Sequence, residues 1–297
     1  MNPQKLSAKT KDVGGIPVVR LIPQANRRTI GAWCFLDHAG PAEFNAFSDG
    51  LQIGSHPHTN LQTFTWMLEG ELWHQDSLGH RQLIRPKQVN LMTAGTGDTH
   101  GIAHTEQTPE GVKNLHAVQL WIALPMNQDI KPDFQHYPEL PEWEDNGVRY
   151  ILTTGRYQGR TAPTAQHSPL LGVDIQCPNA AKLDIPANPS WEYGVLVIAG
   201  KVRINGETFG ADELAFIAAG QAESFSLQAE AGSHFMLLGG EPLPHPTLIW
   251  WNFVADSREA LRRAIEDWNN GSARFGSEID LNGTRLTRLP APEMPGK

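Results

Sequence analysis

Two histidines separated by one residue, His56 and His58, are the first candidates for chemistry in this sequence. They lie in the segment Gly54-Ser55-His56-Pro57-His58, which leads into an apolar run at residues 65–68. In an extended chain the side chains at positions i and i+2 project from the same face, and a proline between them favours extended backbone. Because neutral imidazole is a common metal ligand, this spacing predicts two ligands on one strand.

A second pair with the same spacing, His104 and Glu106, follows in the run GIAHTE. If the two strands are neighbours in one barrel, three imidazoles and one carboxylate converge in its interior. Such a set leaves up to two positions of an octahedral ion open, which favours catalysis or ligand binding. We therefore predict one divalent ion per chain, with iron(II) favoured over manganese, nickel, copper and zinc. A closed tetrahedral zinc site would also find four ligands here, although none is a cysteine thiolate.

Other interpretations of these residues stay open at this stage. A single HxH motif in an arbitrary strand is more often solvated or hydrogen-bonded than metal-bound, and the second pair is what favours a metal site. His100 lies at the same parity as His104 and is its rival for the third ligand position. Glycines on either side of His100, at positions 97 and 101, favour a loop there.

Two further polar residues lie close to these motifs. His74 follows an apolar strand, and we interpret it as a structural histidine satisfied by backbone or by an acidic group. Gln62 lies four residues after His58, where an HxHxxxE pattern would place a carboxylate. An amide is a weak ligand and cannot act as a base, so Gln62 is predicted to be a hydrogen-bonding neighbour of the site.

The elements that must position these residues are mostly short strands. Apolar residues alternate with polar ones in runs such as 65–68, 89–92 and 117–122, separated by glycine, proline and asparagine. One helix is predicted near the C-terminus, with Asp256 as its N-cap. Its apolar positions recur at i, i+3, i+4 and i+7, at Leu261, Ala264, Ile265 and Trp268.

The sequence also repeats within itself. LEGEL at residues 68–72 is echoed by IAGKV at 198–202, and LMTAG at 91–95 by FIAAG at 216–220. Two repeats in the same order predict a duplicated all-β fold, each half a small antiparallel barrel. An offset of 130 between the repeats places Pro186 and Asn188 at the positions of the first two histidines, so the second barrel lacks metal ligands.

The repeat and the proline-rich stretch between its halves predict three regions. Residues 1–125 form a metal-binding N-terminal domain, 126–163 a crossing linker, and 164–297 a C-terminal domain that supports, covers or closes the first.

Composition narrows the class of protein. There are 24 Lys and Arg against 32 Asp and Glu, a net charge of -8, which disfavours direct nucleic-acid binding. Only Cys34 and Cys177 occur, and we expect free thiols in a reducing compartment. The first residues carry no apolar run, and no later stretch has the length of a membrane span. We therefore expect a cytoplasmic protein that does not bind membranes.

Several motifs resemble the pirin family of two-barrel cupin proteins. They cover residues 28–125 densely and the C-terminal half more loosely. They are IGAWCFLDH at 30–38, HPH at 56–58, LEGELWHQDSLG at 68–79, MTAG at 92–95, GIAHTE at 101–106 and LHAVQLW at 115–121. The segment TGDTH at 96–100 looks like an insertion relative to the family pattern.

The resemblance implies a bicupin of two jelly-roll barrels with one metal ion, usually taken to be iron. Transferred to matching positions, the ligands are His56, His58, His104 and Glu106. It also implies a dioxygenase similar to quercetin 2,3-dioxygenase, acting on a flavonol-like substrate with O₂, with Glu106 as the base. Two alternatives remain: a metal-dependent redox-sensing protein with a regulatory protein partner, and a barrel in which the metal is only stabilising and the ligand is a small acid.

Overall fold

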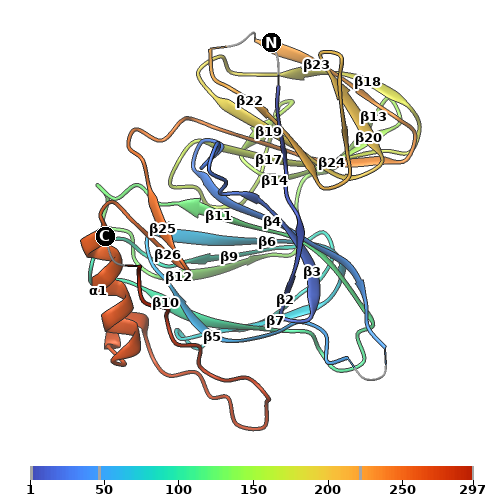
Figure 1. Ribbon diagram of the computed structural model, residues 1–297. Coiled ribbons are helices and arrows are strands. Elements are labelled where there is room, and N and C mark those ends of the chain that lie inside the picture. Colours follow the sequence, from blue (N-terminus) through green and yellow to red (C-terminus); the bar gives the residue numbers. More distant parts are fainter. Residues whose placement is uncertain (1–2, 46–47, 221–222, 296–297) are drawn as a thin grey trace. The chain divides into compact units, whose positions relative to one another are not determined.

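Strands make up most of the chain in the computed structural model, which describes residues 3–45, 48–220 and 223–295 (Figure 1). The residues group into two compact units. The first barrel comprises Lys11–Val18, Ala39–His136 and Pro244–Lys297, and the second barrel comprises Met1–Thr10, Val19–His38 and Tyr137–Leu243. Neither unit is one continuous stretch, whereas the sequence-based division into 1–125, 126–163 and 164–297 assumes that each domain is.

A four-stranded and a seven-stranded sheet form the first barrel, and two strands of the larger sheet, at residues 16–22 and 33–43, also contain residues that group with the second unit. The smaller has the order β5-β10-β7-β8 and consists of β5 (Gln52–His58), β7 (Leu72–Asp76), β8 (Arg81–Ile84) and β10 (Ile102–Gln107). The larger has the order β12-β9-β6-β11-β4-β3-β2. Its strands are β2 (Thr10–Val13), β3 (Ile16–Ile22), β4 (Trp33–Glu43), β6 (Leu61–Gly70), β9 (Val89–Thr93), β11 (Asn114–Ala123) and β12 (Asp133–Tyr137).

The second barrel repeats this arrangement strand for strand. Its smaller sheet has the order β18-β23-β20-β21 and consists of β18 (Ala181–Pro186), β20 (Lys201–Ile204), β21 (Glu207–Gly210) and β23 (Ser224–Ala229). Its larger sheet has the order β1-β22-β19-β24-β17-β14-β13. These strands are β1 (Gln4–Ser7), β13 (Glu142–Asp145), β14 (Val148–Thr154), β17 (Leu170–Cys177), β19 (Glu192–Ala199), β22 (Glu213–Ile217) and β24 (Ser233–Gly240). The predicted duplicated all-β fold is confirmed.

The N-terminal strand β1 belongs to the second barrel. It pairs with β22, with Leu6 opposite Leu214, and the Leu6 side chain is buried. The Lys5 ammonium also lies 2.9 Å from the Glu213 carboxylate. β1 occupies the sheet edge that β12 occupies in the first barrel. Pairing of β1 with this edge satisfies backbone N–H and C=O groups that would otherwise lack partners. A strand of four residues has too short an apolar alternation for its partner strand to be predicted from the sequence.

The C-terminal segment packs on the first barrel. It contains the hairpin of β25 (Leu248–Trp250) and β26 (Phe253–Ala255), the helix α1 (Arg258–Asn269, red in Figure 1) and the short 3-10 helix η1 (Ala273–Phe275). The four apolar positions predicted from the helical spacing are all buried, in a cluster with Ala103 of β10. The predicted N-cap is wrong by one residue: Ser257, not Asp256, accepts the Ala260 N–H at 3.2 Å. Among the described residues, no helix is long and apolar enough to cross a membrane.

Candidate metal centre

The two histidine-bearing strands are antiparallel neighbours. β10 pairs with β5 so that His104 lies opposite His56 and Ile102 lies opposite His58. The intervening Ala103 faces the other way, into the cluster formed with α1. The alternation of a β-strand therefore directs the three histidines into the barrel, while Ala103 packs outward against the C-terminal segment.

A bulge in β5 sets the local register. The pairing shifts between His104 and Glu106, so that Glu106 lies opposite Ile53 and one extra residue is accommodated near Gly54. Glycine is required at position 54 because a Cβ there would lie 1.8 Å from the carbonyl oxygen of Thr287 in the C-terminal segment. The Gly54 carbonyl oxygen in turn accepts a hydrogen bond from His56 Nδ1 at 2.8 Å.

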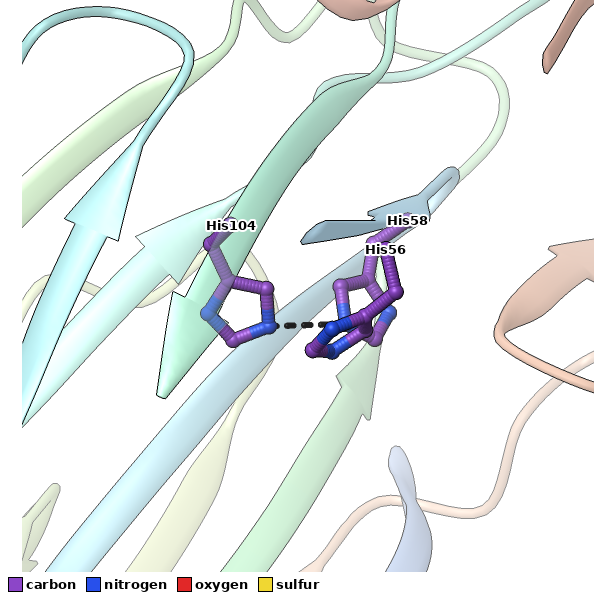
Figure 2. Close-up of side chains that lie close together, drawn as sticks. All are labelled: His56, His58 and His104. Carbon is purple, nitrogen blue, oxygen red and sulfur yellow. Dashed lines mark hydrogen bonds between the residues drawn. The ribbon is translucent and has the colours of Figure 1, made fainter. Parts of the chain in front are cut away.

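Three imidazole rings converge inside the first barrel (Figure 2). One ring nitrogen of each of His56, His58 and His104 lies within 4.8 Å of those of the others. The ring centroids are separated by 4.3 to 5.1 Å. All three side chains are buried, and burial lowers the pKa of His56 to about 4 and those of His58 and His104 well below their ordinary value. The rings are therefore neutral at neutral pH and have lone pairs available for a cation.

The hydrogen bonds around these rings test whether a metal ion fits. His56 Nδ1 and His58 Nδ1 face the carbonyl oxygens of Gly54 and Asn252, at 2.8 and 3.1 Å. A carbonyl oxygen only accepts, so each Nδ1 carries the hydrogen and each Nε2 is left with a lone pair. His58 Nε2 lies 3.1 Å from His104 Nε2, the contact drawn as a dashed line in Figure 2.

That nitrogen pair fits a shared cation. Metal–nitrogen bonds of about 2.1 Å place two ligands at right angles about 3.0 Å apart. A proton could also bridge the two nitrogens, but burial among neutral rings disfavours the positive charge that it would add. The residues present therefore suit a divalent ion held by the three Nε2 atoms, and the donor set of neutral imidazoles favours a transition metal over calcium or magnesium.

Glu106 projects to the same interior but is not part of the group of three. It lies opposite His74 of β7, and its side chain is buried. Burial raises the pKa of its carboxyl to about 7, and no described residue donates a hydrogen bond to it. Burial without a hydrogen-bond donor disfavours the ionised form of a carboxyl, which accounts for the direction of this pKa shift.

The structure brings together His104, and not His100, with the first two histidines. His100 lies in the predicted loop, where its Nε2 is 3.2 Å from the Asp129 carboxylate and 3.1 Å from the Lys131 ammonium. The buried guanidinium of Arg274 in η1 holds this loop by donating to the carbonyl oxygens of Gly97 and His100. The segment before GIAHTE is thus held by contacts outside the group of three histidines.

His74 and Gln62 differ in their position relative to the three histidines. His74 is buried with Nε2 3.1 Å from the Asp76 carboxylate, as expected of a structural histidine, but its Nδ1 also lies 3.2 Å from His104 Nδ1. Gln62 lies opposite Ile122, whereas its neighbour Thr63 lies opposite Trp121, whose ring contacts His58.

Gln62 therefore projects from the other face of the sheet, where its amide donates to Thr93 Oγ1 at 2.9 Å. Its predicted place beside the metal site is wrong. Strand alternation puts Gln62 and Thr63 on opposite faces of the sheet. Which of the two faces the metal site is known only once the partner strand is known.

Sequence reasoning missed the rings of Trp121 and Phe134, which contact His58 and His74, and two hydrogen-bonding partners of the histidines. Asp76 shares strand parity with His74 in the run His74-Gln75-Asp76, a signal that was available in the sequence. Asn252 contributes a backbone carbonyl from the turn between β25 and β26. Because every residue has such a carbonyl, the sequence holds no signal for this contact.

Comparison with known proteins places both barrels in one family. The family described as pirin matches residues 15–122, and the family described as the pirin C-terminal cupin domain matches residues 172–276. A Pseudomonas aeruginosa protein, named provisionally as a quercetin 2,3-dioxygenase, is 49% identical over 291 residues, covering 97% of this chain and 90% of that protein. A pirin-like protein of Caulobacter vibrioides is 36% identical over 288 residues, covering 95% and 97%.

Solved structures agree with this relationship. The crystal structure of a quercetin 2,3-dioxygenase from Acinetobacter baumannii matches with a TM-score of 0.92 at 44% identity, covering 100% of this chain and 97% of that one. A bacterial pirin from Escherichia coli in complex with nickel(II) matches with a TM-score of 0.62 at 19% identity, covering 81% and 100%, and shows the shared fold. The predicted two-barrel cupin architecture is thereby confirmed.

Proposed function

Because the chain belongs to the pirin family, we propose that it holds one iron(II) ion in the first barrel and acts as a dioxygenase on a flavonol-like substrate. The observation that carries this proposal is the convergence of three buried, neutral imidazoles, each with one ring nitrogen within 4.8 Å of those of the others. The second barrel has no counterpart among its described residues, so the expected stoichiometry is one ion per chain. Relatives named as quercetin 2,3-dioxygenases support the substrate class.

We assign His56, His58 and His104 as ligands, with Glu106 as the fourth. When bound, the ion would supply Lewis-acid polarisation of an enolic substrate and a site for reaction with O₂. In a dioxygenase both oxygen atoms of O₂ enter the substrate, so the protein has to move only the hydroxyl proton. Manganese, nickel, copper and zinc suit the same donor set and are the competitors to be tested.

Glu106 is the residue that we assign to that proton. In the metal-free protein, burial raises the pKa of its carboxyl to about 7, in the range of a general base that works at neutral pH. It faces the barrel interior beside His74, within the same sheet as the histidines. A carboxylate there would accept the hydroxyl proton of a flavonol and leave the enolate anion.

Aromatic and apolar side chains line the interior near the histidines. Trp121 contacts the His58 ring edge-on with centroids 5.1 Å apart, and Phe134 stacks on His74. Met92 and Ile102 belong to the same buried cluster as Ala94. Apolar walls of this kind would favour a flat aromatic substrate and would help to protect reactive species from hydrolysis.

The test is anaerobic reconstitution with iron(II), followed by elemental analysis and oxygen uptake with a flavonol such as quercetin. We expect about one ion per chain and oxygen consumption that depends on the flavonol. His56→Ala should weaken iron binding by more than about 100-fold, since it removes a ligand and not merely a ligand's neighbour, and should abolish uptake. His100→Ala, which alters a histidine outside the group, is the matched control and should leave both unchanged.

Glu106→Gln separates the two roles given to the carboxylate. If Glu106 is a ligand, iron affinity falls; if it is only the base, affinity is retained while oxygen uptake falls by roughly 10²–10⁴-fold. Iron binding with no oxygen consumption across a panel of aromatic and enolic substrates would contradict the dioxygenase and favour the redox-sensing, regulatory alternative.

We propose the cytoplasm as the location. Cys34 and Cys177 are both buried and neither takes part in a disulfide, which is compatible with a reducing compartment. A small enolic substrate and O₂ are the proposed partners, and direct nucleic-acid binding is disfavoured by the net charge of -8.

A further inference from the structure

A line of hydrogen-bonding groups runs behind the His104 ring, on the side away from His58. His104 Nδ1 lies 3.2 Å from His74 Nδ1, and His74 Nε2 lies 3.1 Å from Asp76 Oδ2. The three residues come from adjacent strands: Asp76 of β7 is opposite His104 of β10. All three side chains are buried, Asp76 to 0% side-chain exposure.

The Asp76 carboxylate is anchored by the turn that follows β7. Its Oδ1 accepts the backbone N–H groups of Leu78 and His80 at 2.9 and 3.1 Å, and the His80 ring lies 3.1 Å from it. Although burial opposes ionisation, these hydrogen bonds and the one from His74 hold the pKa of Asp76 below its ordinary value. An ionised carboxylate can only accept, so His74 Nε2 must carry the hydrogen.

The proton positions then follow one from another. A neutral His74 with its hydrogen on Nε2 has a lone pair on Nδ1, which accepts a hydrogen bond from His104 Nδ1. His104, with its hydrogen on Nδ1, has its lone pair on Nε2, the nitrogen that faces His58. Reversing any one tautomer would place two N–H groups, or two lone pairs, against each other within this line.

We propose that Asp76 and His74 are positioning residues that fix His104 in the tautomer and orientation needed to bind the metal through Nε2. This inference rests on the proposed metal ligation by the three histidines. His74 and Asp76 touch neither the metal position nor a substrate in this assignment; they act through His104. In metalloproteins such partners orient the ligand and raise its basicity, and their loss typically weakens metal affinity 10–100-fold.

Two features indicate that His74 is more than a structural buried histidine. Phe134 of β12 stacks on the His74 ring with centroids 4.4 Å apart and an interplanar angle of 11°, which fixes the plane in which His74 can accept. In the second barrel, the positions of His74 and Asp76 are taken by Ile204 and Gly206 under the repeat offset. The duplicated fold therefore does not need these polar residues for its stability.

His74→Phe and His74→Asn form the central pair of variants. Phenylalanine keeps a flat ring against Phe134 but offers no acceptor to His104, whereas the asparagine side-chain oxygen lies near the position of Nδ1 and can accept. We expect His74→Phe to weaken zinc(II) affinity 10–100-fold and His74→Asn to restore most of it. His80→Asn is the matched control, because His80 contacts Asp76 from the exposed side, and its zinc(II) affinity should stay within about twofold of that of the unchanged protein.

Asp76→Asn tests the proton positions directly. The N–H groups of Leu78 and His80 require an oxygen at the Oδ1 position, so the amide nitrogen would face His74 Nε2 and donate to it. His74 would then carry its hydrogen on Nδ1, against His104. We expect a loss of zinc(II) affinity similar to that of His74→Phe, with little change in the melting temperature of the metal-free protein.

The spectroscopic readout is ¹⁵N NMR of histidine-labelled protein, with and without zinc(II), which distinguishes ring nitrogens that carry hydrogen from those that do not. We expect His104 with hydrogen on Nδ1 in both states of the unchanged protein, and a different tautomer or tautomer mixture in Asp76→Asn. Wild-type zinc(II) affinity in both His74→Phe and Asp76→Asn would overturn the inference.

The variant His56→Ala distinguishes a failure of the positioning role from a failure of the proposed metal site. If His56→Ala also binds zinc(II) normally, the assigned ligand set is wrong. If only the His74 and Asp76 variants bind normally, the ligand set stands and the positioning role falls. Should the unchanged protein bind no zinc(II), the tautomer of His104 in the metal-free protein still decides the inference.

Discussion

In the first barrel His104 on β10 faces His56 on β5, whereas at the same places in the second barrel Phe225 on β23 faces Ile185 on β18. Likewise, Glu106 lies opposite His74 in the first barrel, and Leu227 lies opposite Ile204 in the second. The four residues of the second barrel are buried in one apolar cluster. One strand arrangement thus encloses either a hydrophobic core or a set of ionisable groups.

The two interiors contribute differently to the stability of their barrels. Burying apolar side chains stabilises the second barrel by roughly 1.5–3 kcal/mol for each large residue. The first barrel instead buries imidazoles and a carboxyl, and these groups must be compensated by hydrogen bonds or by a bound cation. Its remaining apolar contacts and the C-terminal segment provide the stability that the polar interior does not.

A cavity in the second barrel should have a large effect on stability and none on metal binding. Phe225→Ala removes a buried aromatic ring, and we expect the free energy of unfolding of that barrel to fall by about 3–5 kcal/mol. Urea unfolding followed by tryptophan fluorescence measures this, alongside metal titration. Metal affinity should not change, because Phe225 lies at a position without a ligand.

His104→Ala, at the equivalent position of the first barrel, is the matched variant and should reverse the pattern. We expect metal affinity to be lost with a smaller change in urea midpoint. If Phe225→Ala left the midpoint unchanged, or if it abolished metal binding, the two interiors would not have the separate roles given to them here.

The next effect concerns pH. Burial raises the pKa of Glu106 to about 7, so between about pH 4.3 and pH 7 the folded chain keeps a proton that the unfolded chain releases. The free energy of unfolding of the metal-free protein therefore falls as pH rises through this window, by about 4 kcal/mol from this group. Glu106→Gln should be more stable than the unchanged protein at pH 8, and the difference should shrink toward pH 5.

Comparing the two proteins at each pH isolates Glu106 from the histidines. Burial lowers the pKa of His56 to about 4, so that residue reduces stability as pH falls below about 6.5, in both proteins alike. A stability difference between Glu106→Gln and the unchanged protein that does not vary from pH 5 to pH 8 would contradict the buried, unpartnered state of this carboxyl.

The smallest effect concerns the helix that accompanies only the first barrel within the described residues. Ser257→Ala removes the oxygen that accepts the Ala260 N–H, and loss of an N-cap costs about 1 kcal/mol. Asp256→Ala should have a smaller effect, since its side chain does not cap the helix. Equal effects of the two substitutions on the thermal midpoint would contradict the assignment of Ser257 as the N-cap.

Much of the architecture could be predicted from the sequence because strand alternation and internal repetition are local patterns. The repeated motifs predicted two barrels, and the i, i+2 spacing of His56 and His58 predicted a shared face, because the two-residue period of an extended chain needs no knowledge of its neighbours. The amphipathic spacing of Leu261 to Trp268 predicted a buried helical face in the same way.

Pairing register required the folded molecule. The offset of 130 placed Pro186 and Asn188 at the histidine positions, whereas β18 pairs with β23 so that Ile185 lies opposite Phe225 as His56 lies opposite His104. The conclusion that the second barrel lacks ligands is unchanged, but the residues differ because one residue of slip exchanges the two faces of a strand. A bulge such as the one in β5 leaves no mark in the pattern.

Residue types and their i, i+2 spacing are enough to identify possible cation ligands and to place two of them on one face. The folding of the whole unit brings His104 rather than His100 to them, places Asp76 against His74, and brings the Asn252 carbonyl from the C-terminal segment to His58. Side-chain direction follows from the neighbouring backbone, whereas proximity between segments almost 200 residues apart depends on the packing of the whole unit.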